Sequence, residues 1–411
     1  MSILSIMQGD VLAKLKEIPD ESVQCCVTSP PYYNLRSYLS EDHPDKANEI
    51  GAEKTPEEYV AKLVEVFREV KRVLRSDGVC FVNIGDSFAV SGKGGNPTES
   101  KHRKQATNIG SLIKPTKPPQ GLFGKEIIGV PWMLAFALRA DGWRIREEIV
   151  WQKPNCMTES VKDRPTRSHD YIFMLFKNHD YYYDWIAIAE PVAQSSMARI
   201  NQVNFDNQTG GPKDYINGVN PSRSARKTLE NFAKSNSGIK NARSVWTMNV
   251  KPLKEAHTAT FPVELPKRCI SATTSEAGCC PHCRKSWERV IIRGEPDEDW
   301  KKACGADSTG AYSGSATKDY KSVKAQDPSA TKARILEGMR PYITTGWKPT
   351  CGCPPHEPTP SIVLDPFSGA GTTLLACKEL GRNGVGIELN ADYVTLSEKR
   401  IGGDIWSGWV W

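Results

Sequence analysis

The sequence predicts an α/β fold, in which a mostly parallel sheet carries helices on both of its faces. Hydrophobic runs typical of buried strands alternate with helical patterns at both ends of the 411-residue chain. A hydrophobic content of 39% also supplies enough apolar side chains for a large core. We expect strands over the following runs: Leu4–Met7, Val23–Thr28, Val79–Ile84, Ile145–Trp151, Tyr171–Phe176, Ile362–Asp365 and Gly384–Glu388.

Helical patterns lie between these runs and after the last of them. The first pattern begins near Thr55, and Pro56 suits the first turn of a helix because proline has no N–H to bond there. Alternation of strands with helices indicates a parallel sheet whose connections cover both faces. The expected helices are Thr55–Leu74, Val130–Ala140, Thr372–Leu380 and Ala391–Arg400.

The middle of the chain is polar and irregular. The stretches 91–120, 204–244 and 304–334 are rich in Gly, Ser, Asn and Lys, so we expect loops or insertions there. The net charge is only +6, but residues 91–126 hold seven Lys or Arg against two acids, and residues 195–254 hold ten against three. Such segments suit a phosphate backbone as partner, although solvated loops would give the same pattern.

The sequence carries no sign of export or of a membrane span. The N-terminal MSILSIMQGD lacks a basic segment followed by a long apolar run, and the most apolar stretch, Ile127–Leu138, is short and interrupted by Gly129 and Pro131. We therefore expect a cytoplasmic protein without a membrane segment. Its twelve cysteines are then expected to be reduced thiols or metal ligands and not disulfides.

A glycine-containing turn near the C-terminus predicts a ligand site. The strand ending at Asp365 leads into the turn that holds Gly369 and Gly371, a helix follows from Thr372, and a second strand ends at Glu388. The glycines let a ligand approach the backbone, the helix start offers N–H groups, and the acid can accept hydrogen bonds from both hydroxyls of a ribose. A dinucleotide-binding loop or a plain turn is the alternative, but the GxGxxG spacing is absent.

A second motif, Ser29-Pro30-Pro31-Tyr32, follows the apolar strand Val23–Thr28. Two prolines hold an extended turn and place an aromatic ring beyond the strand end. The hydroxyl of Ser29 and the carbonyl of Pro30 could accept both hydrogens of an amino group while Tyr32 stacks on a base taken out of the duplex. A turn that only terminates the strand is the alternative.

Together the two motifs resemble those of bacterial and phage DNA amino-methyltransferases, specifically the permuted beta class in which the catalytic motif precedes the cofactor motif. The family's catalytic signature is Asp, Asn or Ser before Pro-Pro-Tyr or Pro-Pro-Phe, and its cofactor signature is Asp-Pro-Phe-x-Gly-x-Gly-Thr, matched here at Asp365 to Thr372. The resemblance implies a circularly permuted, Rossmann-like S-adenosylmethionine-dependent methyltransferase fold. The N-terminal strand Leu4–Met7 would then supply the strand missing after Glu388.

The resemblance also implies roles for single residues. Asp10 would lie near the adenine of the cofactor, Glu388 would bind its ribose, and Phe261 would lie beside its cleft. A serine at the first catalytic position is more usual for cytosine-N4 enzymes, and an aspartate for adenine-N6 enzymes. The implied catalytic residues are Ser29, Pro30, Pro31 and Tyr32. The implied cofactor-binding residues are Asp10, Phe261, Asp365, Phe367, Ser368, Gly369, Gly371, Thr372 and Glu388.

Two close cysteine pairs depart from the simplest members of that family. Cys280 and Cys283 are followed, after 67 residues, by Cys351 and Cys353. Two such pairs on tight turns can form a closed structural zinc site in a small ribbon-like insert. Unliganded thiols are the alternative interpretation. Nearby residues that could replace one of these ligands are Cys279, His282 and His356.

These observations predict a site-specific methyltransferase that acts on cytosine N4 in double-stranded DNA, as a monomer or a homodimer. The alternatives are an adenine-N6 enzyme, a methyltransferase of RNA or of a protein side-chain amide, and a catalytically silent DNA-binding relic. A base-carbon methyltransferase would need a nucleophilic cysteine, usually in a Pro-Cys dipeptide, and the sequence has none. The expected domains are a catalytic part (1–190), a target-recognition region (191–245), a return to the methyltransferase domain (246–278), a zinc-binding insert (279–353) and a cofactor-binding part (354–411).

Overall fold

A computed structural model describes six stretches of the chain in two compact units. The first unit comprises residues 1–187, 243–288 and 349–411, and the second comprises residues 188–242 and 289–348. Every predicted site residue belongs to the first unit. The described stretches are 2–39, 42–90, 118–193, 238–250, 260–295 and 340–402.

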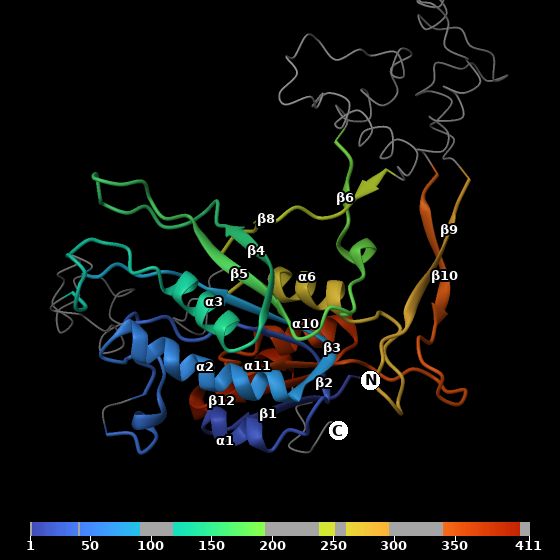
Figure 1. Ribbon diagram of the computed structural model, residues 1–411, viewed down its shortest axis with the longest axis horizontal. Helices are drawn as coiled ribbons and strands as arrows, with labels where there is room; N and C mark the ends of the chain where they lie inside the picture. Colours follow the sequence, from blue (N-terminus) through green and yellow to red (C-terminus); the bar gives the residue numbers. More distant parts are fainter. Residues whose placement is uncertain are drawn as a thin grey trace, which may run out of the picture. The chain divides into compact units, whose positions relative to one another are not determined.

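The first unit is built on an eight-stranded sheet in the order β1-β12-β11-β2-β3-β5-β4-β8 (Figure 1). The five strands from β1 to β3 are parallel to one another, β5 runs antiparallel to both of its neighbours, and β8 is parallel to β4. The strands are β1 (Leu4–Gln8), β2 (Val23–Thr28), β3 (Leu74–Ile84), β4 (Arg144–Gln152), β5 (His169–Phe176), β8 (Val245–Thr247), β11 (Ile362–Asp365) and β12 (Asn383–Glu388).

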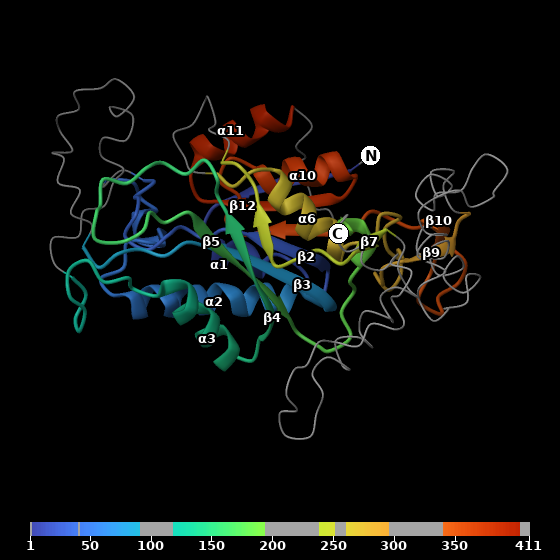
Figure 2. The same cartoon turned by 90° about the horizontal axis from the view of Figure 1, so that it is seen from above.

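Helices cover both faces of this sheet, as Figure 2 shows. On one face lie α1 (Val11–Lys16), α2 (Pro56–Val73) and α3 (Val130–Ala140), and on the other lie α6 (Glu264–Thr273), α10 (Thr372–Leu380) and α11 (Ala391–Ile401). A short 3-10 turn, η1 (Lys46–Asn48), precedes α2. The predicted α/β fold, with a mostly parallel sheet and helices on both faces, is confirmed.

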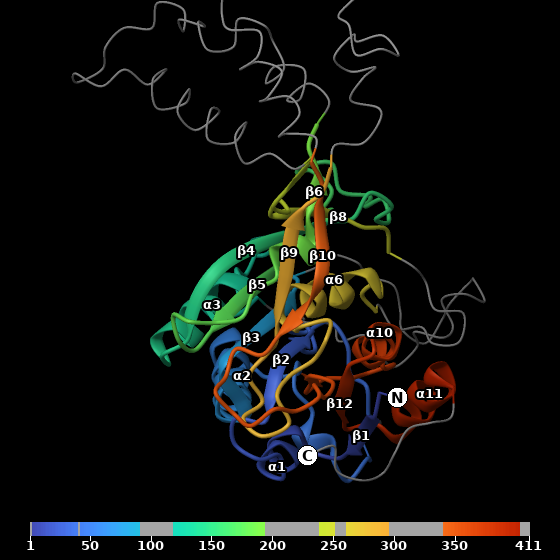
Figure 3. The same cartoon turned by 90° about the vertical axis from the view of Figure 1, so that its right-hand side faces the viewer.

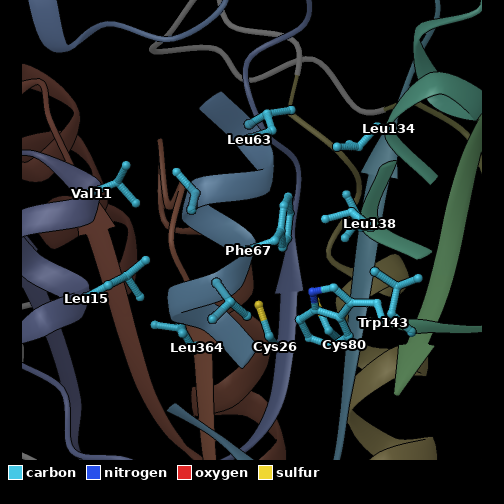
Figure 4. Close-up of a cluster of buried hydrophobic side chains, with 14 of the residues drawn as sticks. Val11, Leu15, Cys26, Leu63, Phe67, Cys80, Leu134, Leu138, Trp143 and Leu364 are labelled. Carbon is cyan, nitrogen blue, oxygen red and sulfur yellow. The ribbon is translucent and has the colours of Figure 1, made fainter. Parts of the chain in front are cut away.

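The sequence of α2 explains its position in the core. The hydroxyl of Thr55 accepts the backbone N–H of Glu58 at 3.1 Å and caps the helix, with Pro56 in the first turn. Apolar residues then recur at helical spacing and face the sheet. Figure 4 shows Phe67 of α2 and Leu138 of α3 pointing toward one another within this cluster.

The second unit contains two small sheets. In one, β6 (Glu190–Pro191) pairs antiparallel with β7 (Ile239–Lys240), after the 3-10 turn η3 (Trp185–Ile188). In the other, β9 (Glu288–Arg293) pairs with β10 (Tyr342–Lys348), and the two strands lie side by side in Figure 3. Most of the expected target-recognition region lies outside the described residues.

The predicted strands of the main sheet are all present, and two features extend the prediction. Strand β1 pairs parallel with β12 from Leu4 beside Gly384 to Gln8 beside Glu388, so the N-terminal strand lies at the edge of the sheet. Strand β3 begins at Leu74, five residues before the expected start at Val79, directly after α2. The polar segment between Leu74 and Val79 hid this extension, because it interrupts the hydrophobic run.

A buried carboxylate joins the two halves of the sequence at the centre of the sheet. Asp365, at the end of β11, accepts hydrogen bonds from the hydroxyl of Thr28 at 2.7 Å, from that of Thr373 at 2.6 Å and from the N–H of Phe367 at 3.1 Å. Its side chain is 1% exposed, and burial raises its pKa to about 6 although these three donors oppose the shift. Asp365 therefore ties the end of β2 and the start of α10 to the end of β11.

Replacing Thr28 by valine removes one of the three donors to this buried carboxylate while keeping the shape of the side chain. We expect Thr28→Val to lower the free energy of unfolding by about 1–3 kcal/mol, measured by urea denaturation at pH 8, because an under-satisfied buried charge is costly. The matched control is Thr395→Val on the exposed face of α11, where the change should stay within about 0.5 kcal/mol. Equal losses of unfolding free energy in the two variants would show that the hydrogen bond from Thr28 to Asp365 does not stabilise the fold.

Candidate functional site

A cavity of about 240 Å³ opens in the first unit, where the carboxyl ends of β2, β11 and β12 meet. The catalytic turn after β2 and the glycine loop after β11 both line it, together with residues of β3, β4 and β5. In open α/β sheets this end of the parallel strands is the usual place for a ligand, because loops and helix starts converge there. All of the predicted catalytic residues line the cavity, namely Ser29, Pro30, Pro31 and Tyr32.

Hydrogen bonds from the antiparallel side of the sheet hold the catalytic turn in place. The hydroxyl of Tyr32 donates to Oδ2 of Asp170 on β5 at 2.9 Å. Nδ2 of Asn83 on β3 donates to the hydroxyl oxygens of Ser29 at 3.1 Å and of Tyr32 at 3.2 Å. Asp170 also pairs with Lys153 on the chain after β4. The turn is therefore fixed by buried charge-assisted and neutral hydrogen bonds.

The close packing around Tyr32 requires a glycine at position 85. A Cβ atom there would lie 2.5 Å from Cε2 of Tyr32 and 2.9 Å from Oδ1 of Asp170. Burial, with a further contribution from the charge of Asp170, raises the pKa of Tyr32 well above its usual value. The phenol therefore stays protonated at physiological pH and remains the donor to Asp170.

The cofactor side of the cavity centres on Glu388 at the end of β12. Its Oε2 accepts the backbone N–H of Gly369 at 2.8 Å, and its Oε1 accepts that of Asn390 at 2.9 Å. Burial raises the pKa of Glu388 to about 7, although these backbone donors oppose the shift. Each carboxylate oxygen has further lone-pair capacity, so the pair can still accept hydrogen bonds from a ligand that carries two hydroxyls.

Of the nine residues predicted to bind a cofactor, three do not line the cavity. Oδ1 of Asp10 accepts the N–H of Ala13 at 2.9 Å and caps α1. Asp365 is enclosed by Thr28 and Thr373, the threonines that donate to it. Gly371 precedes α10 and has a φ of 71°, and a Cβ atom on it would lie 1.9 Å from Oγ of Ser397. The structure therefore shows these three residues shaping the site from behind its wall. The others line the cavity: Phe261, Phe367, Ser368, Gly369, Thr372 and Glu388.

The sequence-based prediction missed several polar residues of the cavity wall. Asn83 interrupts the apolar run of the predicted strand Val79–Ile84, which was the available signal, whereas Asp170 directly precedes the predicted strand Tyr171–Phe176 and gave none. Tyr38 was missed as well. Its carbonyl accepts a hydrogen bond from Nδ2 of Asn390 at 3.0 Å. Its ring packs edge to face against that of Tyr393, with 6.1 Å between the ring centroids. The antiparallel partner strands and the loop after the catalytic turn thus complete the site.

A separate cluster brings together the four cysteines of the two predicted pairs. Their Sγ atoms all lie within 4.8 Å of one another. Backbone N–H groups of His282 and Cys283 lie 3.4 and 3.5 Å from Sγ of Cys280. Burial raises the pKa of the Cys280 thiol, but these hydrogen-bond donors outweigh burial and lower the pKa to about 6. The thiolate form of Cys280 is therefore favoured.

Among the described residues, no helix is long and apolar enough to cross a membrane.

Comparison with known proteins places the chain among DNA methylases. A family model for N6 and N4 enzymes, described as DNA methylase, matches residues 23–280 and 351–399. The chain is 32% identical over 400 residues to the Type II methyltransferase M.Cfr9I of Citrobacter freundii, covering 97% of this chain and 88% of that protein. It is 32% identical over 396 residues to the Type II methyltransferase M.SmaI of Serratia marcescens, covering 96% of this chain and 90% of that protein. A solved structure titled PvuII DNA methyltransferase (cytosine-N4-specific) aligns with 97% of this chain and 86% of that one, at 14% identity and a TM-score of 0.49.

The matched residues include both walls of the cavity. They contain the catalytic turn that begins at Ser29 and the glycine loop that begins after Asp365, and the interval they leave out, 281–350, begins directly after Cys280 and ends directly before Cys351. The model match covers more than half of the chain, and the relatives align along nearly all of it. The chain therefore belongs to the N6/N4 family of DNA methylases and is a DNA methyltransferase.

Proposed function

We propose that this enzyme transfers a methyl group from S-adenosylmethionine to the exocyclic N4 of cytosine in double-stranded DNA. The observation that carries the proposal is a single cavity lined by the Ser29–Tyr32 turn on one side and by the Gly369 loop and Glu388 on the other. Such a cavity can place an amino group and a methyl donor in contact. We propose direct transfer, in which the N4 nitrogen bonds to the methyl carbon with inversion as the S–CH3 bond breaks, S-adenosylhomocysteine leaves, one amino proton passes to solvent, and no covalent enzyme intermediate forms.

The residues of the cofactor side fit S-adenosylmethionine, which supplies an electrophilic methyl group on a sulfonium. Oγ of Ser368 is buried at the cavity wall and has no hydrogen-bond partner among the described residues, so a polar ligand there would satisfy it. Glu388 can accept the two hydroxyls of the ribose through the lone-pair capacity that Gly369 and Asn390 leave. Phe367, half-buried at the wall, offers an apolar surface to the cofactor.

The residues of the catalytic side act on an amino group that is a poor nucleophile, because its lone pair is delocalised into the base. We propose that the hydroxyl oxygen of Ser29 and the carbonyl of Pro30 accept its two hydrogens and draw the nitrogen toward tetrahedral geometry. Tyr32 would stack on the flipped base. Its hydroxyl proton is directed to Asp170, which leaves its oxygen to accept Nδ2 of Asn83.

Asn83 supports this arrangement as a positioning residue. Its amide nitrogen bonds both Ser29 and Tyr32, which fixes the amide orientation. Within the described part of the chain, its Oδ1 atom is then buried without a partner, on a residue that is 2% exposed and lines the cavity. A buried unsatisfied acceptor at this point favours a ligand that donates hydrogen bonds, which an amino group does.

The assignment to cytosine N4 rests on Ser29. A serine hydroxyl is neutral, and in this family serine at that position is more usual for cytosine-N4 enzymes than for adenine-N6 enzymes. We propose that residues 191–245 read the DNA sequence, since their basic, Asn- and Gln-containing composition suits contacts with phosphates and base edges. The relatives are Type II methyltransferases, which supports a place in a restriction-modification system.

Ser29→Ala removes a proposed acceptor of the reacting amine without altering the cofactor side. We expect turnover to fall by at least about tenfold while the Kd for S-adenosylmethionine changes by less than about twofold. Single-turnover methylation and calorimetry measure the two quantities. Ser22→Ala, at a half-buried position before β2 that does not line the cavity, is the matched control and should change neither. Equal losses of turnover and cofactor affinity would make the motif structural.

Glu388→Ala should weaken binding of S-adenosylmethionine by about 1–3 kcal/mol, through loss of charge-assisted hydrogen bonds to the ribose. The raised pKa of Glu388, about 7 in the folded protein, allows a second test by pH. Affinity of the wild type should fall as the pH drops from 8 to 6, because protonation removes the carboxylate that the hydroxyls prefer. Glu388→Gln should bind weakly with no such pH dependence, and Glu398→Gln, exposed on α11, should behave as wild type in calorimetry. Unchanged affinity in Glu388→Ala would remove this residue from the site.

The product is identified by mass spectrometry of nucleosides from duplex DNA methylated in vitro. We expect N4-methylcytosine, because pocket shape and contacts to the flipped base set the choice between amino groups. N6-methyladenine alone would overturn the assignment to cytosine and leave the family and the cavity unaffected. RNA and protein offered under the same conditions should remain unmethylated.

A further inference from the structure

We propose that Cys280, Cys283, Cys351 and Cys353 bind one structural zinc ion, which clips the two ends of the inserted segment to the methyltransferase sheet. The proposal does not depend on the methyl-transfer reaction, because none of the four cysteines lines the cavity. It concerns the point where the chain leaves the first unit near Glu288 and the point where it returns at Pro349.

The geometry of the sulfur atoms fits a tetrahedral zinc site. Zinc binds thiolates at about 2.3 Å, which places pairs of sulfur atoms in a tetrahedron about 3.8 Å apart. All four Sγ atoms of the cluster already lie within 4.8 Å of one another. Four thiolates would leave no open position for chemistry, so the ion would be structural. On binding, the four thiols release their protons to solvent, and the site carries two negative charges.

The first cysteine pair has a backbone suited to hold a metal. The N–H groups of His282 and Cys283 turn toward Sγ of Cys280, where they can stabilise a thiolate. The turn is closed by Arg284, whose N–H donates to the carbonyl of Cys280 at 2.9 Å and whose φ is 61°. A non-glycine residue in this left-handed conformation is held there by its surroundings.

The other possible ligands are placed less well. The thiol of Cys279 is fully buried and lies 3.7 Å from Nε2 of Gln24, outside the cluster of four. Nδ1 of His356 lies 2.6 Å from the carbonyl of Pro354, which uses that nitrogen, and 4.0 Å from Sγ of Cys280. The ring of His282 packs edge to face against that of His356, with 5.6 Å between the ring centroids, and is not part of the cluster of four.

The cluster is fastened directly to the main sheet. Nη1 of Arg75 on β3 donates to the carbonyl of Cys283 at 2.7 Å, and Nε2 of Gln24 on β2 donates to that of Arg284 at 3.3 Å. The second cysteine pair follows Thr350, whose hydroxyl donates to the carbonyl of Ser286 at 2.8 Å. An ion bridging the two pairs would therefore join the outgoing and returning chains to a rigid part of the fold.

This arrangement explains what the metal adds to stability. Folding brings Cys283 and Cys351 together across 67 intervening residues, which costs loop-closure entropy. The free energy of a cross-link between the two pairs would offset this cost more than a single hydrogen bond could. The ion would add to contacts that already join the two ends, namely the pairing of β9 with β10, the two backbone hydrogen bonds between Cys279 and Thr359, and the hydrogen bond from Thr350 to Ser286. Loss of the ion should therefore loosen residues 278–288 and 349–360 while the helices of the sheet stay folded.

The test uses the full-length protein, expressed with zinc in the medium and purified without chelator. Elemental analysis should find one zinc per chain in the wild type and in Cys156→Ser, a half-buried cysteine outside the cluster, and almost none in the Cys351→Ser/Cys353→Ser double variant. Cobalt(II) exchanged into the wild type should give the visible absorption of tetrahedral thiolate coordination. A wild type without zinc, with four free thiols or with disulfides between these cysteines, would overturn the metal site.

Hydrogen exchange then tests the clip. Backbone amides of 278–288 and 349–360 should exchange at least about tenfold faster in the zinc-free variant, while those of α2 and α10 keep the wild-type rate. Binding of S-adenosylmethionine, measured on the same samples, should be retained, so failure of the metal site and failure of the proposed reaction give different results. Unchanged exchange after zinc loss, or loss of protection throughout the sheet, would overturn the clip.

Discussion

The site depends on the buried carboxylate of Asp365. The two motifs that make the cavity begin 337 positions apart, at Thr28 and Asp365, yet their side chains share a hydrogen bond of 2.7 Å at the centre of the sheet. Thr373 completes the connection from the first turn of α10. The same elements are also joined by strand pairing between β2 and β11, which involves two residues on each side, and by a longer hydrogen bond from the hydroxyl of Thr373 to the carbonyl of Val27 at 3.3 Å.

Strands β3 and β5, where the sheet changes from parallel to antiparallel pairing, also contribute to the site. Asn83 on β3 and Asp170 on β5 reach the catalytic turn from behind, and Lys153 neutralises the buried charge of Asp170. Their combined effect is to fix the ring of Tyr32 and the hydroxyl of Ser29 before any substrate arrives. A preorganised site of this kind avoids reorganisation at the moment of reaction, which is the main advantage of a rigid scaffold.

The sequence predicted seven of the eight strands of the main sheet, the helices α2, α3, α10 and α11, and the two motifs of the cavity wall, because these depend on hydrophobic periodicity and on short motifs. It could not separate residues that contact a ligand from those that shape the wall: Asp365 and Gly371 carry the motif, but their side-chain positions are enclosed by Thr28, Thr373 and Ser397. Asn83 and Asp170 were missed because a single polar residue in a buried strand has no periodic signal, and its importance appears only when tertiary contacts are known.

We propose that one cavity brings the methyl donor and the target amino group together. A crystal structure of the enzyme with S-adenosylhomocysteine and a duplex containing its target site tests this most directly. We expect the ribose at Glu388, the sulfur near Gly369, and an extrahelical base against Tyr32 with its amino group at Ser29. A cofactor bound away from the Gly369 loop, or a base that stays stacked in the duplex while the catalytic turn contacts only backbone, would contradict it.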